Sequence, residues 1–120
     1  MKKSLAALAL GALILGACSD DDPTGTGGPG ANEVWMQSST FSPPSRTVSA
    51  GAQVTFTNKE NLQHNVTSNT IPAAATAFSS ANLNLDGTFA VTLTVPGTYN
   101  YHCTLHGTPT TGMRGTIVVN

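Results

Sequence analysis

Four side chains suited to binding a soft metal lie in the second half of the 120-residue chain. Cys103 is expected to end a strand, and His106 follows three residues later inside a predicted loop rich in Gly, Pro and Thr. Met113 closes that loop before the final strand. His64 lies 39 residues before Cys103, just past the polar stretch 58–63. One thiolate, two imidazoles and a thioether match a trigonal His₂Cys site with a long axial Met, which suits copper. The residue types therefore predict a single copper centre formed by His64, Cys103, His106 and Met113.

The same residues allow other interpretations. Zinc is the chemical competitor, because one Cys and two His residues also bind it. A structural zinc site normally offers a fourth strong ligand, and the sequence suggests no second thiolate or nearby carboxylate. Copper is therefore favoured. Taken singly, His64 can be a surface histidine, and a Met before the last strand is more often part of the core.

The N-terminal segment predicts export. Lys2 and Lys3 precede an apolar run, residues 5–15, which is shorter than the roughly 20 residues that span a bilayer. A basic start, a short apolar run and small residues before a break are typical of a signal peptide. The break reads Leu-Gly-Ala-Cys and resembles the lipobox of bacterial lipoproteins. This resemblance implies that residues 1–17 are removed and that Cys18 carries lipid; the alternative is an ordinary signal peptide with an incidental cysteine.

The count of cysteines supports metal binding. The chain contains two, and lipidation would consume Cys18. Cys103 would then be an unpaired thiol in an oxidising compartment, which calls for an explanation. Metal ligation is the most economical one.

The rest of the chain divides into a tether and one domain. Residues 19–30 contain no apolar side chain, so they predict a disordered tether with a reach of roughly 20 Å. The expected organisation is a signal peptide (1–17), a lipidated Cys with its tether (18–31) and a folded domain (32–120). The expected location is the bacterial cell envelope, with the domain anchored to a membrane and facing the periplasm or the exterior.

The expected domain is electrically neutral. Its charged residues are three cations and three anions, namely Arg46, Lys59 and Arg114 against Glu33, Glu60 and Asp86. Such a surface has no basic patch for nucleic acid and no long-range field to steer a charged partner. Nucleic-acid binding is therefore set aside.

The pattern of the domain predicts strands. Short runs alternate with period two between Gly, Pro, Asn and Asp residues, which favours an all-β, two-sheet sandwich. In the run 99–103, Tyr99, Tyr101 and Cys103 share one face and His102 lies on the other. The stretch 71–82, rich in Ala and Ser, is expected to hold a short helix or an irregular crossover. The other expected strands are 34–37, 53–58, 88–95 and 116–119.

Residues 34–119 resemble the blue-copper proteins, or cupredoxins, of the plastocyanin and pseudoazurin type. The matching stretches are Phe-Ser-Pro-Pro (41–44), Val-Ser-Ala-Gly (48–51), Val-Thr-Phe-Thr-Asn (54–58), His-Asn-Val (64–66), Pro-Gly-Thr-Tyr-Asn-Tyr-His-Cys (96–103), His106 and Gly-Met-Arg-Gly-Thr-Ile (112–117). The resemblance implies a Greek-key sandwich of seven to eight strands with one type 1 copper at one end. It carries the ligand roles to the same four residues and suggests that the Asn65 backbone amide donates to the cysteine sulfur.

Two features depart from the resemblance or extend it. Six residues separate His106 from Met113, more than in plastocyanin, which puts the axial role of Met113 in doubt. His102, beside Cys103, occupies the place where copper nitrite reductases and multicopper oxidases bind a second copper. The rest of such a site is missing, because Thr67 and Asn69 stand where nitrite reductases place their catalytic Asp and another His ligand. His102 is therefore expected to be a surface residue.

These observations predict a carrier of single electrons, not an enzyme. The expected protein is a membrane-tethered monomer that cycles between Cu(I) and Cu(II), with electrons passing mainly through the edge of His106. Leu105 and Pro109 suggest a small apolar docking patch for transient redox partners, such as a cytochrome or a terminal reductase or oxidase. The alternative is a protein that delivers or buffers copper at the cell surface.

Overall fold

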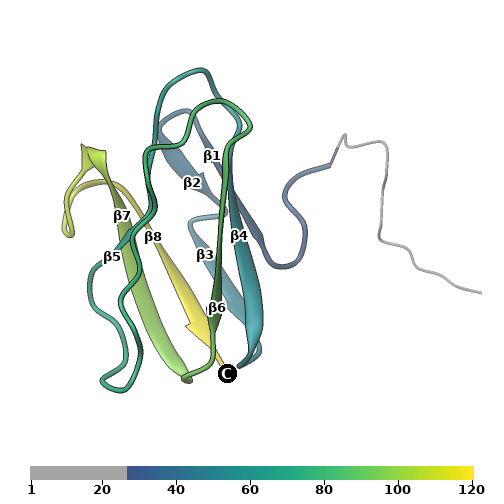
Figure 1. Cartoon of the computed structure of the whole chain (residues 1–120), viewed down its shortest axis with the longest axis vertical. Coiled ribbons are helices and arrows are strands. Elements are labelled where there is room, and N and C mark those ends of the chain that lie inside the picture. The colour runs from purple at the N-terminus through teal and green to yellow at the C-terminus, as the bar shows by residue number, and fades with distance from the viewer. Residues whose placement is uncertain (1–26) are drawn as a thin grey trace, which may run out of the picture.

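The computed structural model describes residues 27–120, which fold into two four-stranded sheets. The predicted signal peptide, Cys18 and most of the tether lie outside the described residues. Across the first sheet the strands are β2 (Thr40–Ser42), β1 (Glu33–Gln37), β4 (Ala52–Asn58) and β6 (Thr88–Leu93). Across the second they are β3 (Ser45–Val48), β8 (Gly112–Val119), β7 (Gly97–Gly107) and β5 (Thr67–Ser68). The all-β sandwich of eight strands is confirmed (Figure 1).

Both sheets are mixed. β1 runs parallel to β4 and β3 runs parallel to β8, whereas the other neighbouring pairs are antiparallel. Neither parallel pair is consecutive in the chain, so each requires a crossover connection. The stretch 71–82, part of the connection from β5 to β6, is irregular rather than helical, and its Ser79 forms a single β-bridge with Thr67. Within residues 27–120 no helix has the length and hydropathy needed to cross a bilayer.

The alternating strands bury the faces that the sequence predicts. Val54 and Phe56 of β4 are fully buried, as are Tyr101 and Cys103 of β7. Three aromatic rings join the two sheets, because Tyr101 packs edge-on against Phe41 and Phe56 with ring centroids 4.7 and 5.1 Å apart. Edge-to-face packing at such distances is favourable for aromatic pairs. This core fixes β4 and β7 relative to each other.

The connection after β4 and the far end of β7 lie at the same end of the sandwich. Figure 1 shows them at the upper end, whereas the C-terminus lies at the lower end. β4 and β7 lie in opposite sheets, and both run upward in this view. The residues that follow β4 therefore lie at the same end of the sandwich as the last residues of β7. The predicted ligands therefore come together at one pole of the domain.

Candidate metal centre

Two elements carry the three predicted strong ligands. His64 lies in the connection between β4 and β5, and its backbone pairs with Leu83 through two hydrogen bonds of 2.7 and 3.2 Å. Cys103 and His106 both belong to β7, whose pairing with β8 is irregular between His102 and Gly107. The expectation that His106 lies in a loop is thus corrected. β8 begins at Gly112, four residues earlier than predicted, and this extension lets β7 continue beyond Cys103.

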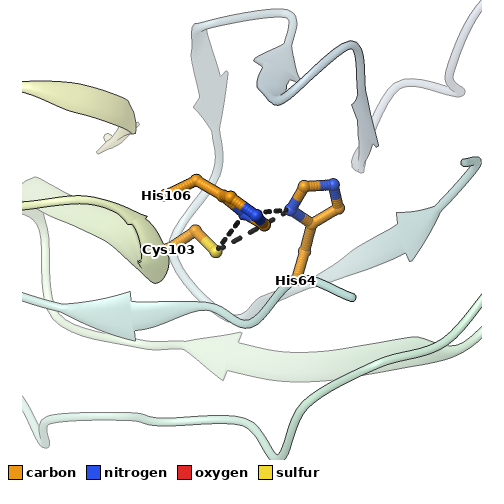
Figure 2. Close-up of side chains that lie close together, drawn as sticks. All are labelled: His64, Cys103 and His106. Carbon is orange, nitrogen blue, oxygen red and sulfur yellow. Dashed lines mark hydrogen bonds between the residues drawn. The ribbon is translucent and has the colours of Figure 1, made fainter. Parts of the chain in front are cut away.

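His64, Cys103 and His106 converge on one point (Figure 2). The Cys103 Sγ lies 3.8 Å from Nδ1 of His64 and 3.6 Å from Nδ1 of His106. The two Nδ1 atoms are 3.1 Å apart. Ligands about 2.0–2.3 Å from one ion, as in His and Cys metal sites, lie about 3–4 Å from each other, so the spacing fits one metal ion. The donor set, one thiol and two imidazoles, fits copper.

Burial differs among the three residues. His64 and Cys103 have no exposed surface, whereas His106 is half-buried. A buried thiol next to two imidazoles is shielded from solution oxidants and from a second thiol. Within residues 27–120 Cys103 is the only cysteine, and it is free. The centre is therefore closed on the His64 side and reaches solvent along His106.

Asn65 ties the connection that carries His64 to strand β7. Its backbone amide donates to the Cys103 Sγ at 3.4 Å, as the resemblance implied. Its side-chain amide donates to the Thr104 hydroxyl at 2.8 Å, and its side-chain carbonyl accepts from the Thr104 amide at 2.9 Å. These contacts connect the segment that carries His64 directly to the strand that carries Cys103. A hydrogen bond to a thiolate also tunes the potential of the metal it binds.

Glu60 is a part of the site that the sequence analysis missed. Its carboxylate lies 2.8 Å from Nε2 of His64, on the side of the ring away from the sulfur. The carboxylate also accepts the backbone amide of Ser39 at 2.8 Å, and this hydrogen bond is the main cause that lowers the pKa of Glu60. The statement that no carboxylate is nearby is therefore wrong. Glu60 nevertheless contacts the outer nitrogen of a ligand, so it does not supply the fourth zinc ligand. Its position four residues before His64 is the signal that the sequence offered.

Met113 lies at the start of β8 and is 2% exposed. Its backbone packs against Gly107, where an added Cβ would lie 2.5 Å from the Met113 nitrogen. Gly107 directly follows His106, so Met113 is next to the end of β7 that carries the two ligands. Its role as axial ligand stays a prediction. Met36 is fully buried in β1, as expected for a core residue.

His102 is not a surface residue. It is 9% exposed, and its Nδ1 is hydrogen-bonded to the side-chain carbonyl of Asn69. Strand β5 lies beside it in the sheet, where Thr67 is its ladder partner, and Asn69 directly follows β5. The sequence could not show this neighbouring strand, because β5 is only two residues long. Across residues 27–120, the group of three or more potential metal ligands is His64, Cys103 and His106, and His102 does not belong to it.

Comparison with known proteins gives consistent results. Residues 30–120 match the family model described as copper-binding proteins of the plastocyanin/azurin family. The chain is 36% identical over 90 residues to amicyanin-alpha of Methylorubrum extorquens, covering 75% of this chain and 72% of the relative. It is 40% identical over 86 residues to plastocyanin A/B of Petroselinum crispum, covering 67% and 87%.

Solved structures of amicyanin variants show the same fold. A Cu(I) form with a Met-to-Gln substitution has a TM-score of 0.63 at 31% identity, covering 73% of this chain and 80% of that one. A reduced Trp-to-Tyr variant has a TM-score of 0.65 at 32% identity, covering 79% and 87%. The likeness therefore extends from the sequence to the sandwich and includes structures that contain copper.

Proposed function

The chain belongs to the plastocyanin/azurin family of copper-binding proteins, and we propose that it carries single electrons through a type 1 copper held by His64, Cys103, His106 and Met113 while it is tethered to a membrane. The convergence of one buried thiol and two Nδ1 atoms carries this proposal. The amicyanin and plastocyanin relatives are electron carriers rather than enzymes, which agrees with it. Their function gives no support to copper delivery or buffering.

The protein's own residues provide what a carrier needs. When bound, copper supplies a one-electron change between Cu(I) and Cu(II). The Cys103 sulfur favours Cu(I) and the two imidazoles accept Cu(II), so the site suits both states. Asn65 and the β7–β8 hairpin fix the ligands before metal binds. A fixed site keeps the change in geometry between the two states small, which favours rapid electron transfer.

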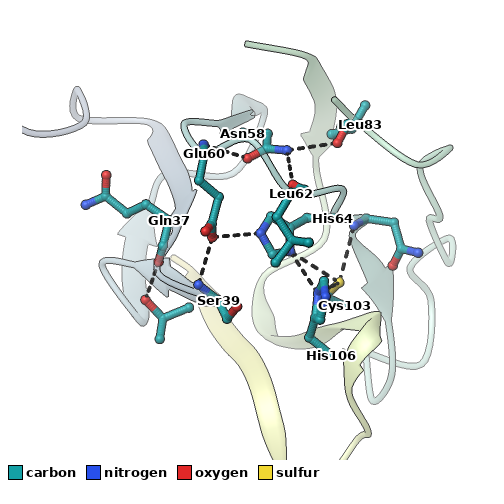
Figure 3. A network of polar contacts seen from close by, with 11 residues as sticks. Gln37, Ser39, Asn58, Glu60, Leu62, His64, Leu83, Cys103 and His106 are labelled. Carbon is teal, nitrogen blue, oxygen red and sulfur yellow. Dashed lines mark hydrogen bonds and ion pairs between the residues drawn. The ribbon is translucent and has the colours of Figure 1, made fainter. Parts of the chain in front are cut away.

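Electrons would pass through the exposed edge of His106. Leu105, its neighbour in the chain, is 45% exposed, and Leu62 beside His64 is 44% exposed (Figure 3). Exposed leucines at a neutral surface suit brief contact with a redox protein. We propose that the partner docks here, and that a cytochrome or a terminal reductase or oxidase is the kind of partner to test.

The membrane tether is the part of the proposal that rests on the sequence alone. Cys18 would carry the lipid, and residues 19–30 would let the domain search for partners near the membrane. Mass spectrometry of protein from a bacterial membrane fraction tests it. A lipid adduct on an N-terminal Cys18 supports the anchor, and an unmodified Cys18 or a cleavage elsewhere contradicts it.

The copper centre is tested by loading the purified protein with Cu(II) and recording its visible spectrum. We expect an intense blue thiolate-to-copper band that bleaches on reduction and returns on oxidation. Cys103→Ala removes the thiolate, so it should abolish the band. A wild-type protein without the band, or a band that survives in Cys103→Ala, would contradict the proposal.

The axial ligand requires a separate comparison. Met113→Leu should shift the reduction potential and leave metal bound, because it removes a thioether but preserves side-chain volume. Met36→Leu is the matched control, since Met36 is an equally buried Met in the core. Equal potentials in the two variants would show that Met113 is a core residue and no ligand.

A further inference from the structure

A continuous line of hydrogen bonds connects the β1–β2 turn to the metal centre (Figure 3). The Ser39 amide donates to the Glu60 carboxylate at 2.8 Å, and Nε2 of His64 lies 2.8 Å from the same carboxylate oxygen. The opposite ring nitrogen of His64 faces Cys103 and His106. The carboxylate and the metal-facing atom are thus on two sides of one imidazole ring.

The backbone of Glu60 is fixed by a hydrogen bond to the buried Asn58. The Glu60 backbone amide donates to the Asn58 side-chain carbonyl at 3.0 Å. Asn58 has no exposed surface, and its side-chain amide donates to the carbonyls of Leu62 and Leu83 at 2.8 Å each. These bonds fix both ends of the segment that leads from Glu60 to His64. The carboxylate is therefore placed by the fold and is not a freely rotating surface group.

The donor on the other side is fixed by an unusual turn. Ser38 and Ser39 join β1 to β2, and both have positive φ angles, 55° and 54°. Two successive residues of this kind form the tight hairpin turn that Asn-Gly usually supplies, and the conformation is costly for residues with a Cβ. In this conformation the Ser39 amide points at Glu60. Backbone conformations that are energetically unfavourable persist where the contacts around them stabilise them.

A carboxylate that accepts from the outer nitrogen has two effects on a histidine ligand. It fixes the tautomer with hydrogen on Nε2, which leaves the Nδ1 lone pair free for the metal. Its negative charge also stabilises the more positively charged state of the metal through the ring. The side chain of Glu60 is 25% exposed, so water screens this charge only in part.

We propose that Glu60 is a positioning residue of the copper centre, which holds His64 in the Nδ1-ligating tautomer and favours Cu(II) over Cu(I), with the Ser38–Ser39 turn as its support. The second effect rests on the proposed copper function, whereas the first concerns the histidine ring itself. The two can therefore be tested apart.

The charge effect is tested with Glu60→Gln, which keeps the shape and an acceptor oxygen but removes the charge. We expect the ratio of Cu(II) to Cu(I) affinity to fall about tenfold, a reduction potential about 59 mV higher for a one-electron couple. The matched control is Asp86→Asn, which removes a negative charge from an exposed carboxylate that pairs with Lys59 at 3.6 Å. Equal potentials in the two variants would overturn the charge effect.

The positioning effect is tested without copper. In ¹⁵N nuclear magnetic resonance spectra of the metal-free protein, His64 should show hydrogen on Nε2, protected from exchange with solvent. Glu60→Ala should remove that protection and populate the other tautomer. Glu60→Gln keeps an acceptor, so it should preserve the tautomer. A wild-type His64 with hydrogen on Nδ1, or no change in Glu60→Ala, would overturn the positioning role.

Folding of the variants is checked by thermal unfolding of the metal-free proteins. If Glu60→Ala is unfolded, the tautomer of His64 in the wild-type protein decides the positioning role, and Glu60→Gln decides the charge effect through the reduction potential. If wild-type protein gives no blue band, the proposed function fails while the tautomer measurement still decides the positioning role. The two failures are therefore distinguishable.

Discussion

His64 and His106 offer the same atom, Nδ1, to the thiol of Cys103, yet their outer edges differ. The far nitrogen of His64 contacts a carboxylate inside the protein. His106 is half-buried, and its edge reaches solvent. The sequence predicts that both histidines are ligands. It does not predict this difference between their surroundings, because the contacts of the outer ring nitrogen depend on the folded structure around each histidine. In the proposed carrier, His64 would tune the metal and His106 would face the redox partners.

Tyr101 gives a prediction at the scale of one side chain. Its hydroxyl is buried without a hydrogen-bond partner, and burial raises its pKa above the usual value. Tyr101→Phe removes an unsatisfied polar atom and should leave the free energy of unfolding at neutral pH unchanged or raise it by up to about 1 kcal/mol. Tyr99→Phe is the matched control, because the Tyr99 hydroxyl donates to the Val95 carbonyl at 2.7 Å. It should cost about 1 kcal/mol in urea unfolding.

The same residue makes stability depend on alkaline pH. A folded-state pKa above the unfolded value means that the folded protein holds its proton more tightly. The contribution is complete below the unfolded pKa of about 10 and falls by about 1.4 kcal/mol per pH unit above it. Tyr101→Phe should lessen this fall in urea titrations above that pH. Identical alkaline slopes in wild type and variant would contradict the prediction.

The β7–β8 hairpin is the element on which the site depends most. It carries Cys103 and His106 on one strand and Met113 on the other. The hairpin closes where Gly107 faces Gly112, and both positions are crowded by backbone. Gly112 also has a φ angle of 77°, which favours glycine. The close approach of the two strands is what brings Met113 beside His106.

Gly107→Ala should therefore disturb both the fold and the site. An added Cβ would lie 2.5 Å from the Met113 nitrogen and 2.8 Å from its carbonyl oxygen, so the strands must move apart. We expect a cost of about 1–3 kcal/mol, seen as a lower thermal midpoint of the metal-free protein, and a weaker blue band after loading. Gly28→Ala, where a Cβ meets nothing within 4 Å, is the control. If Gly107→Ala has the same thermal midpoint and the same blue band as Gly28→Ala, the predicted crowding at Gly107 is contradicted.

The sequence predicted the strands in which apolar and polar residues alternate over several positions. It missed the strands that are too short to show such an alternation. β4 and β7 were predicted because every second residue is apolar. β2, β3 and β5 have two to four residues each, too few for a period to appear. The role of Glu60 was missed for a related reason, because its partner is the backbone amide of Ser39, and no side chain signals where that amide points.

At the scale of the folded domain, the positive and negative side chains are equal in number, and several of them are paired or hydrogen-bonded. Lys59 pairs with Asp86, and Arg46 donates to the backbone carbonyls of Gly30 and Glu33 at 2.7 and 2.6 Å. The formal charge of residues 31–120 is zero, so attraction over distances longer than about 10 Å is weak. Docking of the proposed redox partner would therefore rely on short-range apolar contact.

This balance predicts a weak effect of salt on electron transfer. The rate constant for reduction by a small redox protein should change by less than about threefold between low and high ionic strength. Stopped-flow measurement with the Cu(II)-loaded protein provides the value. Leu105→Glu is a useful companion, because a charge placed beside His106 should introduce salt dependence. A steep dependence in the wild type would contradict neutral docking.

The half-buried position of His106 has a kinetic consequence for the proposed electron carrier. Its donor and acceptor would use the same small face, so they would bind in turn and never together. Each complex has to separate before the next can form, and turnover cannot exceed the slower of the two dissociation rates. With association at about 10⁵–10⁷ M⁻¹s⁻¹, short residence times require loose complexes. A partner that held this face tightly would act as an inhibitor of the protein it is meant to serve.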